Sequence, residues 1–197
     1  MDSQSRFDGI LIRNKGVLRT AEATAEGFSR VALGDYVCKR GLMRVARGVY
    51  LAPDAWEDGL LLFQMRFPKS VFSDETAQYL LGLAEREPMR YTVSVPANHN
   101  TSGIRKAGAD VCRVKAEWFP LGIEMIETPA GSQVRTYNAE RTICDLLRHR
   151  NRVDGQDVQS ALRAYARRRG KDIPQLMRFA DALGVERILR PYLEALL

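Results

Sequence analysis

The chain has 197 residues, which suggests one large domain or two small ones, and its apolar content of 45% is sufficient for buried cores. No apolar run is long enough to span a bilayer, and the polar N-terminus lacks the apolar region of a signal peptide. We therefore expect a cytoplasmic protein with no membrane partner. The formal net charge of +6 favours an acidic partner such as nucleic acid, although charge alone supports this only weakly.

The cysteines and histidines form no pattern typical of a metal site. Cys38, Cys112 and Cys144 lie far apart in apolar surroundings, which predicts reduced thiols. Only His99 and His149 accompany them, so no close Cys/His grouping exists and we expect no bound metal. The sequence also lacks a phosphate-binding loop, a Gly-x-Gly-x-x-Gly motif and a Gly-x-Ser-x-Gly motif. We therefore expect no cofactor and no enzyme activity.

The first part of the chain predicts two short helices. Apolar residues recur at helical spacing over residues 7–11, and this helix should stop near residues 15–16. Residues 17–18 are expected to be a short link. Thr20 is then in position to cap a second helix, which alanines keep slim enough for another helix to approach closely.

Residues 28–51 predict a helix followed at once by a hairpin. Ser29 is in the N-cap position of the helix, and Gly41 is in position to close it. Two short β-prone runs then meet around Arg47. A helix followed by a small basic hairpin has the shape of a recognition helix and its wing, so we predict a winged helix-turn-helix domain over residues 1–54. The core side of the recognition helix would carry Leu33, Tyr36 and Val37.

The outer side of this helix carries side chains suited to DNA. Arg30 can form a bidentate pair with guanine, and Val31 can contact a thymine methyl. Gly34 costs about 1 kcal/mol against alanine inside a helix, so close approach to DNA or to a second domain would explain it. We expect groove contacts from Arg30, Val31, Gly34 and Asp35, and phosphate contacts from Thr20, Ser29, Lys39, Arg44 and Arg47.

Two plainer interpretations of this segment remain open. A basic helix surface is usually only solvated, and helix-plus-hairpin patterns also occur in α+β domains that bind no nucleic acid. The segment would also suit an interaction module whose winged helix binds protein.

A polar change of composition follows residue 54, and residues 55–197 predict a larger mixed α/β domain, so the fold class is α+β. Trp56 and Leu60 begin a predicted helix that ends before Pro68, and Ser73 caps the next helix. Residues 97–103 are expected to be a polar loop. Strands are predicted at Tyr91–Pro96, Val111–Val114, Ile123–Ile126 and Gln133–Tyr137.

From about residue 138 the chain is predicted to be helical, with Asn138 as a cap. Asp145 is placed to pair with Arg141 or Arg148, which would fix its helix to the sheet. Basic residues also gather in this segment. At the end of a helix, cations can simply offset the helix dipole. The alternative is a functional one, in which these residues form an electropositive face that binds an acidic partner. The residues of this face would be Arg148, Arg150, Arg163 and Arg167.

Several blocks of the sequence, in order, resemble the AbiEi family, the antitoxins of type IV toxin–antitoxin systems that act in abortive infection. The ordered set is more specific than the hairpin block alone, and it covers nearly the whole chain. Asp74 departs from the family, whose members often carry histidine at that position. The blocks are residues 28–30, 42–50, 72–77, 91–96 and 140–147.

The resemblance implies a protein with two activities. The winged helix would bind double-stranded DNA at inverted repeats in its own promoter and act as an autoregulating transcriptional repressor. The larger part would neutralise a cognate nucleotidyltransferase-like toxin, without needing a stable complex, and so contribute to phage resistance. The alternative from another class is a nucleic-acid-processing enzyme with a winged-helix targeting domain, for which the sequence offers no metal-binding set.

Overall fold

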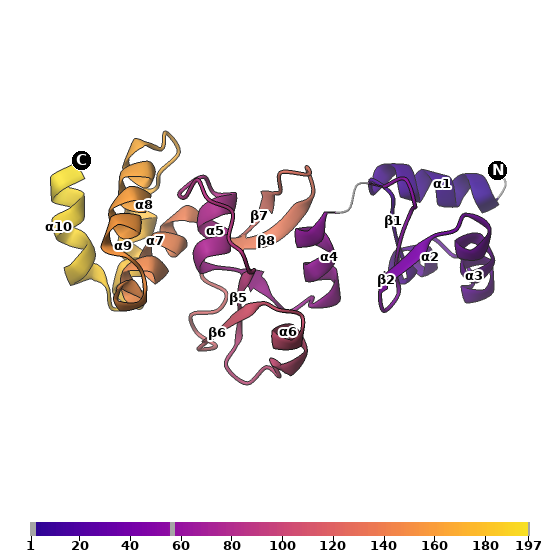
Figure 1. Cartoon of the computed structure of the whole chain (residues 1–197), viewed down its shortest axis with the longest axis horizontal. Helices are drawn as coiled ribbons and strands as arrows, with labels where there is room; N and C mark the ends of the chain where they lie inside the picture. The colour runs from indigo at the N-terminus through magenta and orange to yellow at the C-terminus, as the bar shows by residue number, and fades with distance from the viewer. Residues whose placement is uncertain (1–2, 56–57, 197) are drawn as a thin grey trace. The chain divides into compact units, whose positions relative to one another are not determined.

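The computed structural model describes residues 3–55 and 58–196 of the chain. Within these residues the protein has ten α-helices, one short 3-10 helix and eight strands in two sheets, which confirms the α+β class. The chain divides into two compact units, Met1–Pro68 (unit 1) and Lys69–Leu197 (unit 2), whose elements are labelled in Figure 1.

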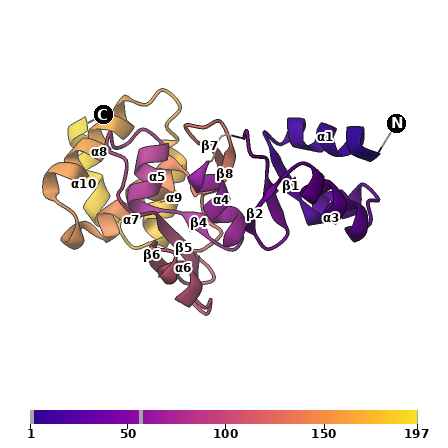
Figure 2. The same cartoon turned by 45° about the vertical axis from the view of Figure 1, so that its right-hand side comes forward.

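Unit 1 combines helices with a three-stranded antiparallel sheet of order β1-β3-β2. Figures 1 and 2 show α1, α2 and α3 gathered around the strands. The helices are α1 (Ser3–Arg13), α2 (Thr20–Ala25), α3 (Arg30–Lys39) and α4 (Gly59–Arg66), and the strands are β1 (Val17–Arg19), β2 (Met43–Ala46) and β3 (Val49–Leu51).

The two faces of this sheet bury different partners, because successive side chains of a strand point to opposite faces. Leu18 packs into the core of α1, α2 and α3, where the Phe7 ring stacks on Phe28 and Tyr36 at centroid distances of 3.8 and 4.5 Å. On the other face, α4 covers Val17, Val49 and Leu51 with Leu61, Leu62 and Met65. Since α4 completes this packing, the chain divides after Pro68 and not at the predicted residue 54.

Two local predictions for unit 1 are wrong. Residues 17–18 are not a link, because Val17 pairs with Leu51 and Leu18 pairs with Tyr50 as part of β1. Thr20 does not cap α2 but is its first residue, and the N-cap position is held by Arg19 without a side-chain bond. The predicted helix that includes Trp56 begins at Gly59 in the structure, and Trp56 lies outside the described residues.

Unit 2 packs helices on a five-stranded mixed sheet of order β6-β5-β4-β8-β7. The β5–β6 and β4–β8 pairs are parallel, and the β4–β5 and β7–β8 pairs are antiparallel. The strands are β4 (Val71–Phe72), β5 (Thr92–Pro96), β6 (Asp110–Val114), β7 (Ile123–Glu127) and β8 (Gln133–Tyr137). The helices are α5 (Asp74–Leu80), α6 (Ser102–Lys106), α7 (Ala139–Arg148), α8 (Gly155–Arg167), α9 (Ile173–Ala182) and α10 (Glu186–Leu196), with the 3-10 helix at Arg150–Arg152.

The four strands predicted for this part are all present, and β8 has the predicted bounds. The sequence missed β4, which is only two residues long, and α6, which begins at Ser102 inside the predicted loop. The predicted cap at Asn138 is confirmed, since its side chain accepts a bond of 3.0 Å from the Arg141 amide. The helix α7 contacts α5 as well as α8, α9 and α10, and it contributes the centre of the helical core (Figure 1).

Candidate functional site

The helix α3 has defined ends. Its start is capped as predicted, because the Ser29 hydroxyl accepts a bond of 3.1 Å from the Ala32 amide. At its end Gly41 has a φ of 62°, a conformation that glycine adopts at little cost. The Leu42 amide then donates to the Val37 carbonyl at 3.0 Å, and the Gly41 amide donates to the Cys38 carbonyl at 3.2 Å. This pair of bonds is a Schellman motif, which fixes where the helix stops.

One side of α3 is exposed along its length. Leu33 and Tyr36 are buried in the unit 1 core, as predicted, whereas the Val31 side chain is 73% exposed. Gly34 is also exposed, and a Cβ atom added to it would meet no described atom within 4 Å. Packing within unit 1 therefore does not account for this glycine. The exposed side consists of Arg30, Val31, Gly34, Asp35 and Cys38, with Lys39 exposed at the end of the helix.

The hairpin brings a second group of predicted residues together. The Thr20 amide donates to the Gly48 carbonyl at 2.8 Å, so the half-buried start of α2 adjoins the hairpin turn that carries Arg47. Arg44 pairs with Tyr50 while Ala46 pairs with Val49, which leaves Val45 as a β-bulge in the edge strand β2. A bulge re-aims neighbouring side chains. Both Arg44 and Arg47 are exposed beside it.

The charges of unit 1 fall into two classes. Glu22 and Glu26 both bind Arg13, with N–O distances of 2.9 and 2.5 Å, and Asp8 binds Arg40 at 2.9 Å. In contrast, the part of the chain that the structure describes offers no salt-bridge partner to the basic side chains of the α3 side and the hairpin. These unpaired cations are Arg30, Lys39, Arg44 and Arg47.

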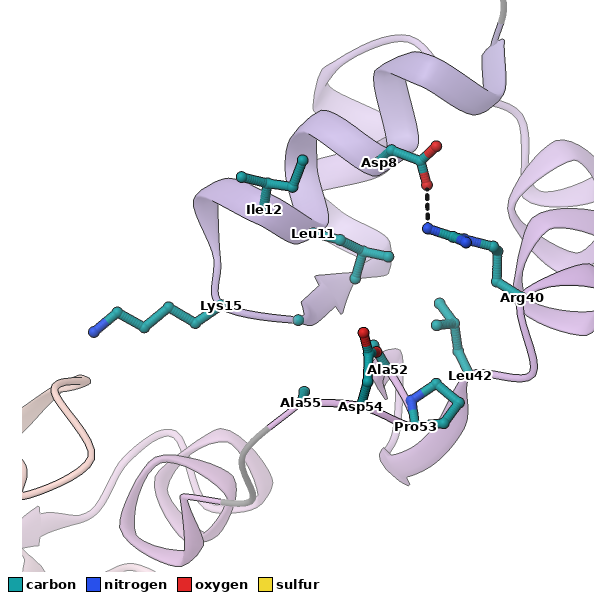
Figure 3. A pocket seen from close by; sticks show the side chains of 11 residues that line it. Asp8, Leu11, Ile12, Lys15, Arg40, Leu42, Ala52, Pro53, Asp54 and Ala55 are labelled. Carbon is teal, nitrogen blue, oxygen red and sulfur yellow. Dashed lines mark hydrogen bonds and ion pairs between the residues drawn. The ribbon is translucent and has the colours of Figure 1, made fainter.

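Arg40 differs from these cations because it belongs to a network that ties α3 to α1. Asp8 accepts from the Tyr36 hydroxyl at 2.5 Å as well as from Arg40. Burial, together with the bond to Asp8, raises the pKa of the Tyr36 phenol. This network borders a pocket of about 600 Å³ between α1 and the segment after β3 (Figure 3). None of the residues predicted to contact DNA lines this pocket.

The predicted basic face of unit 2 consists of residues with different surroundings. The Arg148 guanidinium lies 4.4 Å from the centre of the Trp118 ring, which Lys115 also approaches to 4.6 Å. Arg150 donates to the Leu147 carbonyl at 3.1 Å, so it satisfies the end of α7. Arg163 and Arg167 are exposed one helical turn apart on α8.

Asp145 forms the ion pair predicted with Arg141. Arg141 is fully buried, and its Nε donates to Asp145 Oδ2 at 2.9 Å. Its Nη1 donates to the carbonyls of Trp118 and Leu121 at 2.6 and 3.1 Å, which ties α7 to the segment before β7. Burial raises the pKa of Asp145 to about 6, against the opposing effect of the Arg141 charge. The pair has the structural role expected of it.

Unit 2 contains a polar cluster that was not predicted from the sequence. The Cys112 thiol donates to Asp74 Oδ2 at 3.3 Å, and His149 Nδ1 lies 2.8 Å from Asp74 Oδ1. Asp74 therefore lies between the thiol and the imidazole, whereas a nucleophilic cysteine and its base require the imidazole in the middle. These residues are 38 and 75 positions apart, so only the tertiary fold brings them together.

Comparison with known proteins adds the fold but no activity. No protein-family model matches the chain, and no curated protein does. Among solved structures it is similar to the RV2827C protein from Mycobacterium tuberculosis, with 12% sequence identity and a TM-score of 0.50 over 98% of this chain and 82% of that one. At this identity the likeness shows a shared fold alone. Across residues 3–55 and 58–196, no helix is long and apolar enough to cross a membrane. The same residues contain no group of three or more His, Cys, Asp or Glu side chains that could hold a metal ion.

Proposed function

We propose that unit 1 is a winged helix-turn-helix that binds double-stranded DNA, with α3 as the recognition helix and the β2–β3 hairpin as the wing. The observation that carries this proposal is the set of exposed cations without salt-bridge partners on α3 and the hairpin, whereas Asp8, Glu22 and Glu26 are already paired. DNA phosphates would supply the missing counter-charges.

The exposed side of α3 suits the major groove, which admits an α-helix. Arg30 lies at the start of the helix, where recognition helices contact base edges. Val31 offers an apolar contact for a thymine methyl, and Gly34 leaves room for close approach of DNA. Arg44 and Arg47 would contact phosphates on either side of the bulge in β2.

Together with the resemblance to AbiEi antitoxins, this supports a specific role. The protein would repress its own operon at inverted repeats, and unit 2 would neutralise a nucleotidyltransferase-like toxin. Arg163 and Arg167 are the members of the predicted basic face whose guanidinium groups have no partner among the described residues, so they are the first candidates for contact with the toxin or its substrate.

The repressor proposal is tested by binding of the full chain to the DNA upstream of its own gene. Replacing Arg44 and Arg47 together by alanine should weaken binding to all sequences and reduce the slope of log affinity against log salt by about 2, one for each phosphate contact. Arg30→Ala should instead relax sequence preference, at a cost of about 1–3 kcal/mol at one base pair.

A matched control is the double replacement of Arg163 and Arg167 by alanine, which removes the same charge from unit 2. It should leave DNA affinity nearly unchanged, and coexpression with a cognate nucleotidyltransferase-like toxin would show whether it weakens protection. Absence of any gel retardation of the upstream DNA by the unchanged protein would overturn the repressor proposal.

A further inference from the structure

The carboxylate of Asp74 joins three elements of unit 2 that are distant in sequence. Asp74 is the first residue of α5, Cys112 lies in β6, and His149 follows the last residue of α7 as its C-cap. The Asp74 and His149 side chains are 17% and 31% exposed. Because an ionised carboxylate only accepts hydrogen bonds, the Nδ1 of His149 must carry the proton that they share.

The backbone of Asp74 indicates that this contact is favourable. Asp74 has a φ of 46°, and Lys15 is the only other non-glycine residue with positive φ among residues 3–55 and 58–196. Such a conformation is unusual for a non-glycine residue and persists only where the surroundings impose it. The bonds from His149 and Cys112 help to hold Asp74 there.

The charges around this contact differ in sign. Asp145, one turn before His149 on α7, raises the pKa of His149, whereas Arg148 lowers it. Arg141 lies on the far side of Asp145 and is bound to it. Cys112 faces Asp74 from β6, and the charge of Asp74 also reaches the buried phenol of Tyr137 at the end of β8. The surroundings thus contain two carboxylates and two guanidinium groups besides the imidazole.

We propose that Asp74 and His149 form a proton-dependent latch, closed when the imidazole is charged and loosened when it is neutral, which holds the end of α7 against the start of α5. Arg148 and Arg150 flank His149, so the latch also sets the position of two residues of the predicted basic face. The latch does not depend on the proposed function, whereas its influence on toxin neutralisation does.

The direction of the pH dependence follows from the two groups. The bond to Asp74 raises the pKa of His149 above its ordinary value, against the effect of burial. The stabilisation that charged His149 gains from its bond to Asp74 is complete below the ordinary histidine pKa. It disappears as the pH rises through the raised pKa of His149. Burial would raise the pKa of Asp74, but the bond and charge of His149, together with the bond from Cys112, outweigh it and lower that pKa. The Asp74 contribution is therefore lost only as the pH falls through the lowered value.

The sequence contains only two histidines, which makes the test direct. In the full-length protein, an NMR titration of the imidazole signals should show His149 changing charge at a pH above the ordinary histidine pKa. The protection factors of the α7 end amides, which correct for base-catalysed exchange, should fall over the same pH range as the His149 transition. A His149 transition at or below the ordinary histidine pKa, or protection at the α7 end that does not follow His149, would overturn the latch.

The pKa of His149 could be raised by Asp74 or by the negative end of the α7 dipole, and a variant of Asp74 distinguishes the two effects. Asparagine tolerates positive φ and keeps the shape of the side chain, so Asp74→Asn removes little more than the charge. It should shift the His149 titration downward, whereas Asp181→Asn on the exposed side of α9 should leave it unchanged. If Asp74→Asn does not fold, the titration and exchange of the unchanged protein still decide the question.

Discussion

The helices α3 and α7 have the same length and opposite surroundings. Each has ten residues, but α3 buries only Leu33 and Tyr36, whereas α7 buries every residue except the last. Their polar side chains therefore act in different ways. In α7 the buried Arg141 and Asp145 satisfy each other, whereas in α3 the exposed Arg30 has no acidic partner among the described residues.

The difference shows that polar residues on a helix identify a binding surface only when their burial is known. A buried charge must be paired within the protein, because leaving it unpaired costs several kcal/mol. An exposed charge is solvated and remains available to a partner at little cost. The comparison leads to three experiments, in order of decreasing effect.

Arg141→Ala should have the largest effect, a loss of about 3–5 kcal/mol in the unfolding free energy of unit 2, because it leaves Asp145 buried without its partner. Urea unfolding followed by Trp118 fluorescence, in a Trp56→Phe background, would report on unit 2. Replacing the pair together, as Arg141→Met with Asp145→Leu, should recover much of the loss. Equal losses in the single and double variants would contradict the pairing argument.

Gly122→Ala should have an intermediate effect in the same region. Gly122 has a φ of 75°, and a Cβ there would lie 2.7 Å from the Cβ of Arg141 and 2.8 Å from Asn138 Oδ1. Both the strained backbone and the clash oppose a side chain, so we expect unit 2 to lose more than about 1 kcal/mol. The same unfolding measurement applies. A neutral outcome would mean that the segment before β7 moves away from α7 easily.

Gly34→Ala should have the smallest effect and the opposite sign. Gly34 is helical and exposed, with open space around it, so alanine should stabilise α3 by about 0.5–1 kcal/mol. If this side of α3 contacts DNA, the same variant should bind the upstream DNA more weakly despite its greater thermal stability. A variant that gains stability and keeps full affinity would place the DNA contact elsewhere.

Local features of unit 1 and unit 2 could be predicted where a few neighbouring residues determine them. The Ser29 and Asn138 caps, the Gly41 helix end and the strand β8 all depend on side chains within a few positions. The pairing of Arg141 with Asp145 was predictable for the same reason, since residues four apart in a helix are neighbours. The exposed side of α3 also followed from helical spacing.

Features that depend on distant residues could not be predicted. The strand β1 looked like a link because its partner β3 lies more than 30 residues later, as the pairing of Val17 with Leu51 shows. The bonds of Asp74 to Cys112 and His149 required the whole fold of unit 2. A glycine or serine at a helix end indicates its own local conformation. No single residue indicates a contact with a side chain 38 or 75 positions away.

The packing of α4 on the sheet of unit 1 has a consequence for how the chain can be cut. A fragment ending at residue 55 would keep α3 and the hairpin, yet it would expose Val17, Val49 and Leu51, the apolar face that α4 covers. An uncovered apolar sheet face favours self-association, which in a binding assay would imitate cooperative attachment to DNA. A fragment made to test DNA binding should therefore extend through Pro68, where the compact unit ends.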